Sequence, residues 1–316
     1  LHPSMPELAR MYRNKQAAIV HAVATPYRDR SHFDGQDVLQ SGFPGPGQVE
    51  SGWLNRALSA LPKGEHVMGG LAVGPTTPLV LRGPAATVGW EPVGLPPAGD
   101  DTAMRVLDLY QHRDSALGVA LAEGLRLDKT AKGSEMTMSA AGGGPAHMRL
   151  VARGAAKLMA AENGPRIAAL ALDGWDTHAN EGGPVGRLAM LLSGLDGALA
   201  EFESGLGEHW RDTVVVAATE FGRTARINGT EGTDHGTATI ALLAGGAVSG
   251  GRVIADWPTL KPAGLYQNRD LAPTTDLRAV IKGVLSDHLG LSERVLAGAV
   301  FPGSAAAKPM KGLISA

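Results

Sequence analysis

Four short stretches of the 316-residue chain concentrate the residue types that bind metal ions or transfer protons. Each combines histidine or carboxylate side chains with threonine or arginine. They are residues 25–34 (TPYRDRSHFD), 173–178 (DGWDTH), 219–224 (TEFGRT) and 232–236 (GTDHG). Imidazole and carboxylate groups are ligands of Zn²⁺ and Mn²⁺, and either group can act as a general base. The four stretches predict one polar site if the fold brings them together.

Within these stretches, five side chains are candidate metal ligands: Asp176, His178, Glu220, Asp234 and His235. Asp176 and His178 are two residues apart, so both can face one side of an extended segment, as metal ligands must. Glu220 comes directly after an apolar run and could serve as a ligand or as a base.

Each candidate also has a structural interpretation. A single loop histidine such as His32 is as often a surface residue as a ligand. Glu220 could form an ion pair with Arg223 or Arg226, and Asp234 could be a turn residue. Four such stretches in one domain nevertheless favour a functional site over four unrelated coincidences.

Apolar runs of strand length precede or follow the four stretches. They are residues 17–24, 166–172, 213–218 and 240–244. Helices are predicted over residues 6–12, 103–127, 145–163, 184–203 and 275–289, the last capped by Thr274. Wholly apolar strands that alternate with helices predict an α/β fold, with a mainly parallel sheet flanked by helices on both faces.

Three of the stretches leave the carboxyl ends of predicted strands, where ligands bind in open α/β sheets. The fourth, residues 232–236, precedes its strand and could fold back over them. Residues 66–93 contain short β-type runs broken by glycine and proline, which predict a small antiparallel excursion. Residues 129–144 are rich in glycine, serine and threonine and are typical of a surface loop.

Composition excludes several classes of partner and site. Lys and Arg number 29 against 31 Asp and Glu, a formal charge of −2, so nucleic-acid binding is not expected. No apolar run approaches the ~18 residues of a membrane span. The chain has no cysteine, which excludes disulfides, thiolate nucleophiles and thiolate metal sites.

Together the four stretches resemble an uncharacterised bacterial family, a domain of unknown function. That family is placed in the alkaline-phosphatase-like superfamily, with the sulfatases and the cofactor-independent phosphoglycerate mutases. The resemblance extends from the N-terminus to residues 301–303 and implies one alkaline-phosphatase-like domain over residues 1–316. It also implies a periplasmic or exported protein.

The resemblance implies roles for individual residues as well. Superfamily enzymes use two metal ions and a serine, threonine or formylglycine nucleophile, and Ser31 lies where that nucleophile is expected. Zinc or manganese is the expected metal, because imidazole ligands suit these ions better than Mg²⁺. The expected metal ligands are Asp176, His178, Glu220, His235 and Asp234, with Glu220 also a candidate base. Arg30 and Arg223 are expected to bind an anionic substrate group.

The leading hypothesis is therefore a metal-assisted hydrolase or transferase that acts on a small phosphate or sulfate ester. The rival is a non-catalytic binding protein that keeps the fold and has lost the metals. Two departures favour the rival: Asp176 and His178 are two apart where the superfamily has Asp-x-x-x-His, and Phe221 follows Glu220 where it has histidine. The first strand of the superfamily, with its metal-binding aspartate, is also missing. We therefore expect an upstream segment of a few tens of residues to supply both.

Overall fold

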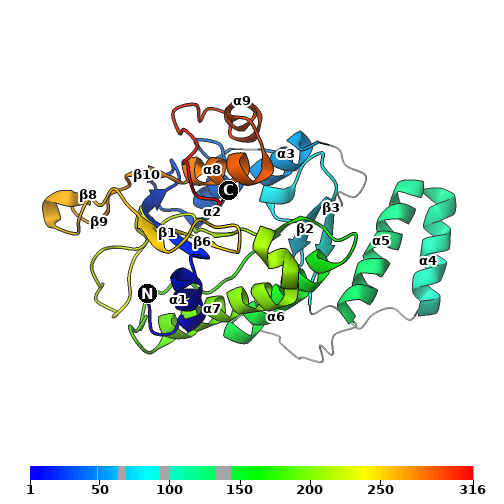
Figure 1. Cartoon of the computed structure of the whole chain (residues 1–316), viewed down its shortest axis with the longest axis horizontal. Helices are drawn as coiled ribbons and strands as arrows, with labels where there is room; N and C mark the ends of the chain where they lie inside the picture. Colours follow the sequence, from blue (N-terminus) through cyan, green and yellow to red (C-terminus); the bar gives the residue numbers. More distant parts are fainter. Residues whose placement is uncertain (48, 63–68, 93–99, 133–143, 316) are drawn as a thin grey trace.

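The computed structural model describes residues 1–316 except 48, 63–68, 93–99, 133–143 and 316. The fold is mixed α/β, with helices packed around two separate sheets and a small hairpin (Figure 1). The helices of the described residues are α1 (Pro6–Arg13), α2 (His32–Ser41), α3 (Trp53–Ala60), α4 (Asp100–Arg113), α5 (Ser115–Lys132), α6 (Pro145–Ala160), α7 (Arg187–Leu206), α8 (Leu277–Leu289) and α9 (Glu293–Val295).

The larger sheet is built on β1 (Ala17–Ala24), the strand expected over residues 17–24. One edge of β1 pairs parallel with β7 (Arg252–Ile254) and then with β10 (Thr275–Asp276). The other edge pairs antiparallel with β6 (Thr239–Ala244), which pairs antiparallel with β5 (Val215–Ala217). The sheet is therefore mixed, and the expected mainly parallel sheet is not confirmed.

The direction of β6 follows from its connection to β5. The loop that joins these strands contains no helix, and neighbouring strands without a helical crossover pair antiparallel. Because β6 runs opposite to β1, its first residue, Thr239, pairs with Val23 near the end of β1. The stretch 232–236 thus reaches the carboxyl edge of β1 directly and does not need to fold back over it.

The second sheet contains β3 (Thr87–Trp90), β2 (Gly70–Val73) and β4 (Ile167–Leu170) in that order, all parallel. The antiparallel excursion expected over residues 66–93 is thus wrong within the described residues of that range. Its two strands are parallel and belong to one sheet with β4. Residues 66–68 and 93 lie outside the described residues. The hairpin of β8 (Leu265–Tyr266) and β9 (Asp270–Leu271) forms a separate pair.

The β1 strand separates two hydrophobic cores. Ala17 and Ile19 pack in the core that contains α1, α6 and α7. Ala18 and Val20 pack in the core that contains α8 and the π-helical segment η4 (Leu296–Val300). Successive side chains of a strand point to opposite faces, so a wholly apolar strand requires cover on both faces. Both faces of β1 are therefore covered by helices, as the apolar run predicted.

Near its end β1 contains a β-bulge. The register with β6 shifts between His21 and Val23, and the buried Ala22 has a positive φ of 53°. A bulge bends a strand and re-aims the chain that leaves it. Here the bulge precedes the loop of residues 25–31, which leads into α2.

Two helix predictions need correction. The helix expected over residues 103–127 is a pair, α4 and α5, that projects from the body of the molecule (Figure 1). Asp114 separates them, because its Oδ1 accepts hydrogen bonds from the backbone N–H groups of Ala116 and Leu117. The cap of α8 is Asp276, which accepts from Arg278 N, and the expected cap Thr274 donates instead to Asp256 O.

The loop expected over residues 129–144 lies mostly outside the described residues, although α5 continues to Lys132. Among the helices that the structure describes, none is both long and apolar enough to cross a bilayer.

Candidate metal centre

The four chemically rich stretches are hydrogen-bonded to one another. Thr233 N donates to Thr177 O, and Thr224 N donates to Asp234 O. Arg223 and His235 form an isolated antiparallel β-bridge. The first stretch joins through the Arg30 carbonyl, 2.9 Å from His235 Nδ1. The strand ends and the hydrogen bonds between loops therefore bring residues of all four stretches together, although these stretches lie as far apart in the sequence as Arg30 and His235.

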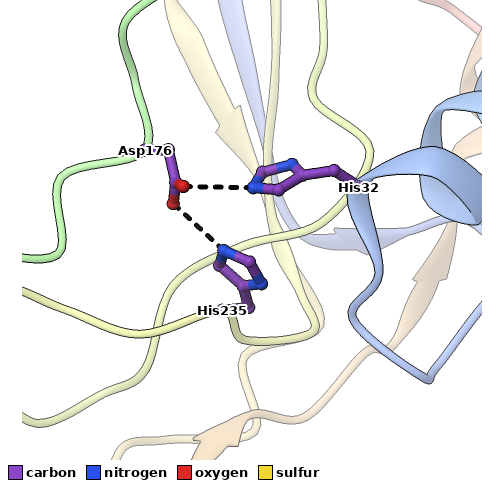
Figure 2. A group of neighbouring side chains, drawn as sticks. All are labelled: His32, Asp176 and His235. Atoms are coloured by element: carbon purple, nitrogen blue, oxygen red, sulfur yellow. Dashed lines mark hydrogen bonds and ion pairs between the residues drawn. The ribbon is translucent and has the colours of Figure 1, made fainter.

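Three imidazole rings meet one carboxylate at this place, and we call His32, Asp176, His178 and His235 the histidine cluster. The Nε2 atoms of His178 and His235 lie 2.9 Å and 3.0 Å from Asp176 Oδ1, and 3.0 Å from each other. The Nε2 atom of His32 lies 3.3 Å from the other oxygen, Asp176 Oδ2. Figure 2 shows His32, at the start of α2, and His235, in a loop, both pointing toward Asp176.

The Nδ1 atom of each ring is held by an acceptor outside the histidine cluster. These acceptors are Glu220 Oε1 for His32 (2.7 Å), Asp234 Oδ1 for His178 (3.3 Å) and the Arg30 carbonyl for His235 (2.9 Å). A carboxylate or carbonyl oxygen only accepts, so Nδ1 of each ring carries a proton. Each Nε2 faces the Asp176 carboxylate, and in a neutral ring its lone pair would be available to a cation bound there. Metal-binding histidines in proteins are oriented in this way.

The donor set fits a divalent transition metal. Nε2 of His32 is buried and makes no hydrogen bond, although it lies 3.3 Å from Asp176 Oδ2. Ligand atoms of His32, Asp176 and His235 all lie within 4.8 Å of one another. Two imidazole nitrogens and a carboxylate oxygen, with Nε2 of His178 beside two of these three residues, suit Zn²⁺ or Mn²⁺, whereas Mg²⁺ prefers an oxygen shell. The residues present therefore match the expected metal.

Charges around the histidine cluster keep Asp176 ionised. Burial alone would raise the pKa of Asp176, but Arg223 and the neighbouring histidines outweigh burial and lower it from 3.8 to about 2. Burial also lowers the pKa of His32, and the carboxylates of Glu220 and Asp176 outweigh that effect, so the pKa is raised above 6.5. A cation bound here would compete with protons for these rings.

The guanidinium group of Arg223 completes the polar arrangement. Its NH1 donates to Asp176 Oδ1 at 2.5 Å, while Nε donates to Thr233 Oγ1 at 3.0 Å and NH2 to the Thr233 carbonyl. Two of its nitrogens are thus anchored on one residue, and only NH1 reaches the histidine cluster.

The sequence of this chain matches a known protein family. The family model described as "Protein of unknown function (DUF1501)" matches residues 12–300, which is most of the sequence. The chain belongs to the DUF1501 family. No curated protein and no solved structure matches it.

Several residues of this DUF1501 chain do not occupy the positions that the sequence predicted for them. Glu220 and Asp234 lie behind His32 and His178 as hydrogen-bond acceptors and do not face the histidine cluster directly. Arg30 meets the histidine cluster through its carbonyl, because its guanidinium is bonded to Asp270 and Gln267.

Ser31, the expected nucleophile, is the N-cap residue of α2 and directly precedes His32. Its side chain makes no capping hydrogen bond, so the hydroxyl is not committed to the helix.

Two residues were missed or misjudged by sequence reasoning. The sequence does not distinguish His32 from an ordinary loop histidine, yet its ring is the third imidazole of the histidine cluster. Phe221 stands where the superfamily has a metal-binding histidine and cannot serve as a ligand; its ring packs 5.0 Å from that of His32 and 4.9 Å from that of His235. It is 8% exposed and forms an apolar wall behind both rings.

Proposed function

We propose that this DUF1501 chain is a metal-dependent hydrolase that acts on small phosphate or sulfate esters. The observation that carries the proposal is the convergence of three Nε2 atoms on Asp176, with each opposite Nδ1 held by an acceptor. A structural hydrogen-bond network would satisfy these nitrogens, whereas here Nε2 of His32 is buried with no hydrogen bond and only a 3.3 Å contact with Asp176 Oδ2.

The chain's own residues supply most of the required functions. A divalent ion, when bound, would lower the pKa of a hydroxyl or water and offset charge on an ester oxygen. His32, Asp176, His178 and His235 would hold that ion, and the uncommitted hydroxyl of Ser31 would be the nucleophile. Glu220 would orient His32 through Nδ1.

Arg223 supports an anionic substrate. Because Thr233 anchors two of its nitrogens, NH1 is held beside Asp176, and its second N–H can donate to a substrate oxygen while the first stays on Asp176. A guanidinium beside a cation site favours a tetrahedral oxyanion over a neutral substrate. This is the basis for choosing phosphate and sulfate esters.

An alkaline-phosphatase-like fold is part of the proposal. It is supported by the sequence resemblance, by helical cover on both faces of β1, and by the position of the histidine cluster beyond the end of that strand.

The first test is metal content. Zn²⁺ should bind the purified wild-type chain at about one ion per chain or more. The variants His32→Ala and His178→Ala should each lose more than about 100-fold in Zn²⁺ affinity, because removing a ligand costs more than the 10–100-fold typical of its supporting residues. His209→Ala is the matched control, since His209 lies in the 3-10 segment η2 (Gly207–Asp212).

Activity is then measured on p-nitrophenyl phosphate and p-nitrophenyl sulfate with Zn²⁺ or Mn²⁺ added. Metal-dependent release of nitrophenol that disappears in His178→Ala supports the proposal. A wild type that binds no metal, or a His178→Ala variant that binds it as well as wild type, contradicts it.

The rival function is a non-catalytic binding protein without metal. The bond of 2.5 Å between Arg223 and Asp176 favours it, because a guanidinium already compensates the carboxylate that a cation would need. On that hypothesis the wild type would bind inorganic phosphate or sulfate without Zn²⁺ and would release no nitrophenol.

A further inference from the structure

A second carboxylate lies behind the histidine cluster and is entirely buried. Asp270, the first residue of β9, is 0% exposed. Its Oδ2 accepts hydrogen bonds from Arg30 Nε at 2.8 Å and from Thr237 Oγ1 at 2.6 Å, and lies 2.7 Å from Arg30 NH2. A buried carboxylate is costly to desolvate, so its charge must be compensated, and Arg30 provides that compensation.

Arg30 has an unusual backbone conformation. Its φ is +62°, in the left-handed region that residues other than glycine, asparagine and aspartate rarely adopt. Such strain persists only when surrounding contacts enforce it. The side chain supplies those contacts, because Gln267 Oε1 also accepts from Arg30 NH2 at 2.7 Å. The β8–β9 hairpin therefore anchors the Arg30 side chain and holds the backbone in this conformation.

This conformation aims the Arg30 carbonyl at the histidine cluster. The carbonyl lies 2.9 Å from His235 Nδ1, and Nε2 of the same ring lies 3.0 Å from Asp176 Oδ1. An unbroken chain of contacts thus runs from Asp270 through the Arg30 side chain and backbone to the inward nitrogen of His235.

The same hairpin also holds the backbone of His235. Arg269 NH2 donates to the His235 carbonyl at 2.9 Å, and Asp270 forms an isolated β-bridge with Thr224. His235 is therefore fixed at its ring through Arg30 and at its carbonyl through Arg269.

We propose that Asp270 is a positioning residue of the metal centre, which acts through Arg30 to direct Nε2 of His235 inward. The inference rests on the proposed function, since it concerns the same metal centre. No sequence motif indicated that Asp270 supports that centre. Its competitor is a purely structural role, in which Asp270 stabilises the hairpin and leaves the cluster unaffected.

The matched control is another buried aspartate. Asp196 is 4% exposed and accepts hydrogen bonds from Leu8 N at 2.8 Å and from Glu7 N at 3.1 Å, in the first turn of α1. Asp270→Asn and Asp196→Asn each remove one negative charge from a buried position. Only Asp270 is connected to the histidine cluster.

The experiment measures Zn²⁺ affinity of the full chain by competition with a chelator, and thermal melting of the metal-free proteins. We expect Asp270→Asn to weaken Zn²⁺ binding about 10–100-fold, the range typical for residues that orient metal ligands. We expect Asp196→Asn to melt earlier but to bind Zn²⁺ as wild type does. Equal weakening in both variants, or none in Asp270→Asn, overturns the proposal.

If Asp270→Asn does not fold, Arg30→Gln tests the same link, because it keeps the backbone carbonyl and removes the guanidinium. A similar loss of Zn²⁺ affinity supports the proposal, and wild-type affinity overturns it.

A second readout needs no metal. In ¹⁵N–¹H spectra of the histidine rings, the Nδ1–H of His235 should give a slowly exchanging signal, assigned by its loss in His235→Gln. The signal should survive in Asp196→Asn and disappear or shift in Asp270→Asn. If the wild type binds no Zn²⁺, the proposed function fails and this signal alone decides: dependence on Asp270 supports positioning, and an unchanged signal overturns it.

Discussion

The histidine cluster and the surroundings of Lys282 in α8 show two ways in which this protein holds charged side chains. Lys282 is 1% exposed, and its Nζ donates to the backbone carbonyls of Ser304 at 2.7 Å and Ala307 at 2.9 Å. At the histidine cluster, by contrast, side chains remain partly open to solvent, and Nε2 of His32 makes no hydrogen bond and only a 3.3 Å contact with Asp176.

The difference separates a structural polar site from a candidate functional one. A group that only stabilises the fold has its hydrogen bonds completed within the protein. A group that receives a ligand keeps an atom uncommitted, and its neighbours fix its direction instead. Changes at the histidine cluster should therefore alter binding more than stability, and changes at Lys282 should do the reverse.

Among the variants that compare these two regions, Glu220→Gln is expected to have the largest effect on Zn²⁺ binding. Glutamine can still accept from His32 Nδ1, but it lacks the charge that stabilises the ring, so Zn²⁺ affinity should fall about 10–100-fold. Because Arg223 bonds to Asp176 and Thr233 and not to Glu220, no buried charge is left unpaired. The free energy of unfolding should change by less than about 1 kcal/mol. A variant with normal Zn²⁺ affinity and a strongly lowered melting temperature would show that Glu220 is structural.

Lys282→Met should give the opposite pattern. Methionine fills a similar volume but leaves the Ala307 carbonyl without a donor, while the Ser304 carbonyl keeps only the N–H of Ala307. The free energy of unfolding should therefore fall by about 2 kcal/mol. Zn²⁺ affinity should be that of wild type. Denaturant unfolding and chelator competition on the same sample measure both, and a loss of Zn²⁺ affinity would contradict the separation of the two sites.

Lys282 should also make the free energy of unfolding depend on pH. Burial lowers the pKa of Lys282 below 10.5 in the folded state. Between that lowered value and 10.5 the unfolded chain binds more protons, so stability should rise as pH increases through this window. The rise is measured as the difference between wild type and Lys282→Met, in which the contributions of other groups cancel. A difference that stays constant up to about pH 10 would contradict the expectation.

The smallest effect is expected from Arg223→Gln. The variant removes the guanidinium that competes for Asp176 Oδ1 and repels a cation, so Zn²⁺ affinity should increase a few-fold, by about 1 kcal/mol at most. Hydrolysis of nitrophenyl esters should decrease, because the anion-binding donor is gone. Weaker Zn²⁺ binding in this variant would show that Arg223 supports the centre and does not compete with the ion.

Apolar pattern alone predicted the β1 strand, its helical cover and most of the long helices, because burial on both faces leaves an unbroken apolar run. It did not predict the direction of β6. The loop between β5 and β6 is long enough to contain a crossover helix, and only its pairing with neighbouring loops shows that it contains none. That direction is what places residues 232–236 beside the end of β1.

The sequence predicts which residues belong to the candidate site, but it does not predict the role of each residue. Asp176, His178 and His235 lie in recognisable stretches, and the structure brings them together. His32 could not be distinguished from an ordinary loop histidine without its partners. Asp270 lies outside all four stretches, and its importance depends on contact with Arg30, 240 positions earlier in the chain.

The contact between Arg30 and His235 spans 205 positions and has a consequence for when the centre can form. The pairing of β1 with β6, which brings these positions together, is equally distant, since Ala17 pairs with Ala244. Contacts of such long sequence separation form late, because the chain loses loop entropy before they stabilise it. A nascent chain that ends before β6 would present its histidines singly. We therefore expect the metal ion to bind after the chain has folded, at a site that is already formed.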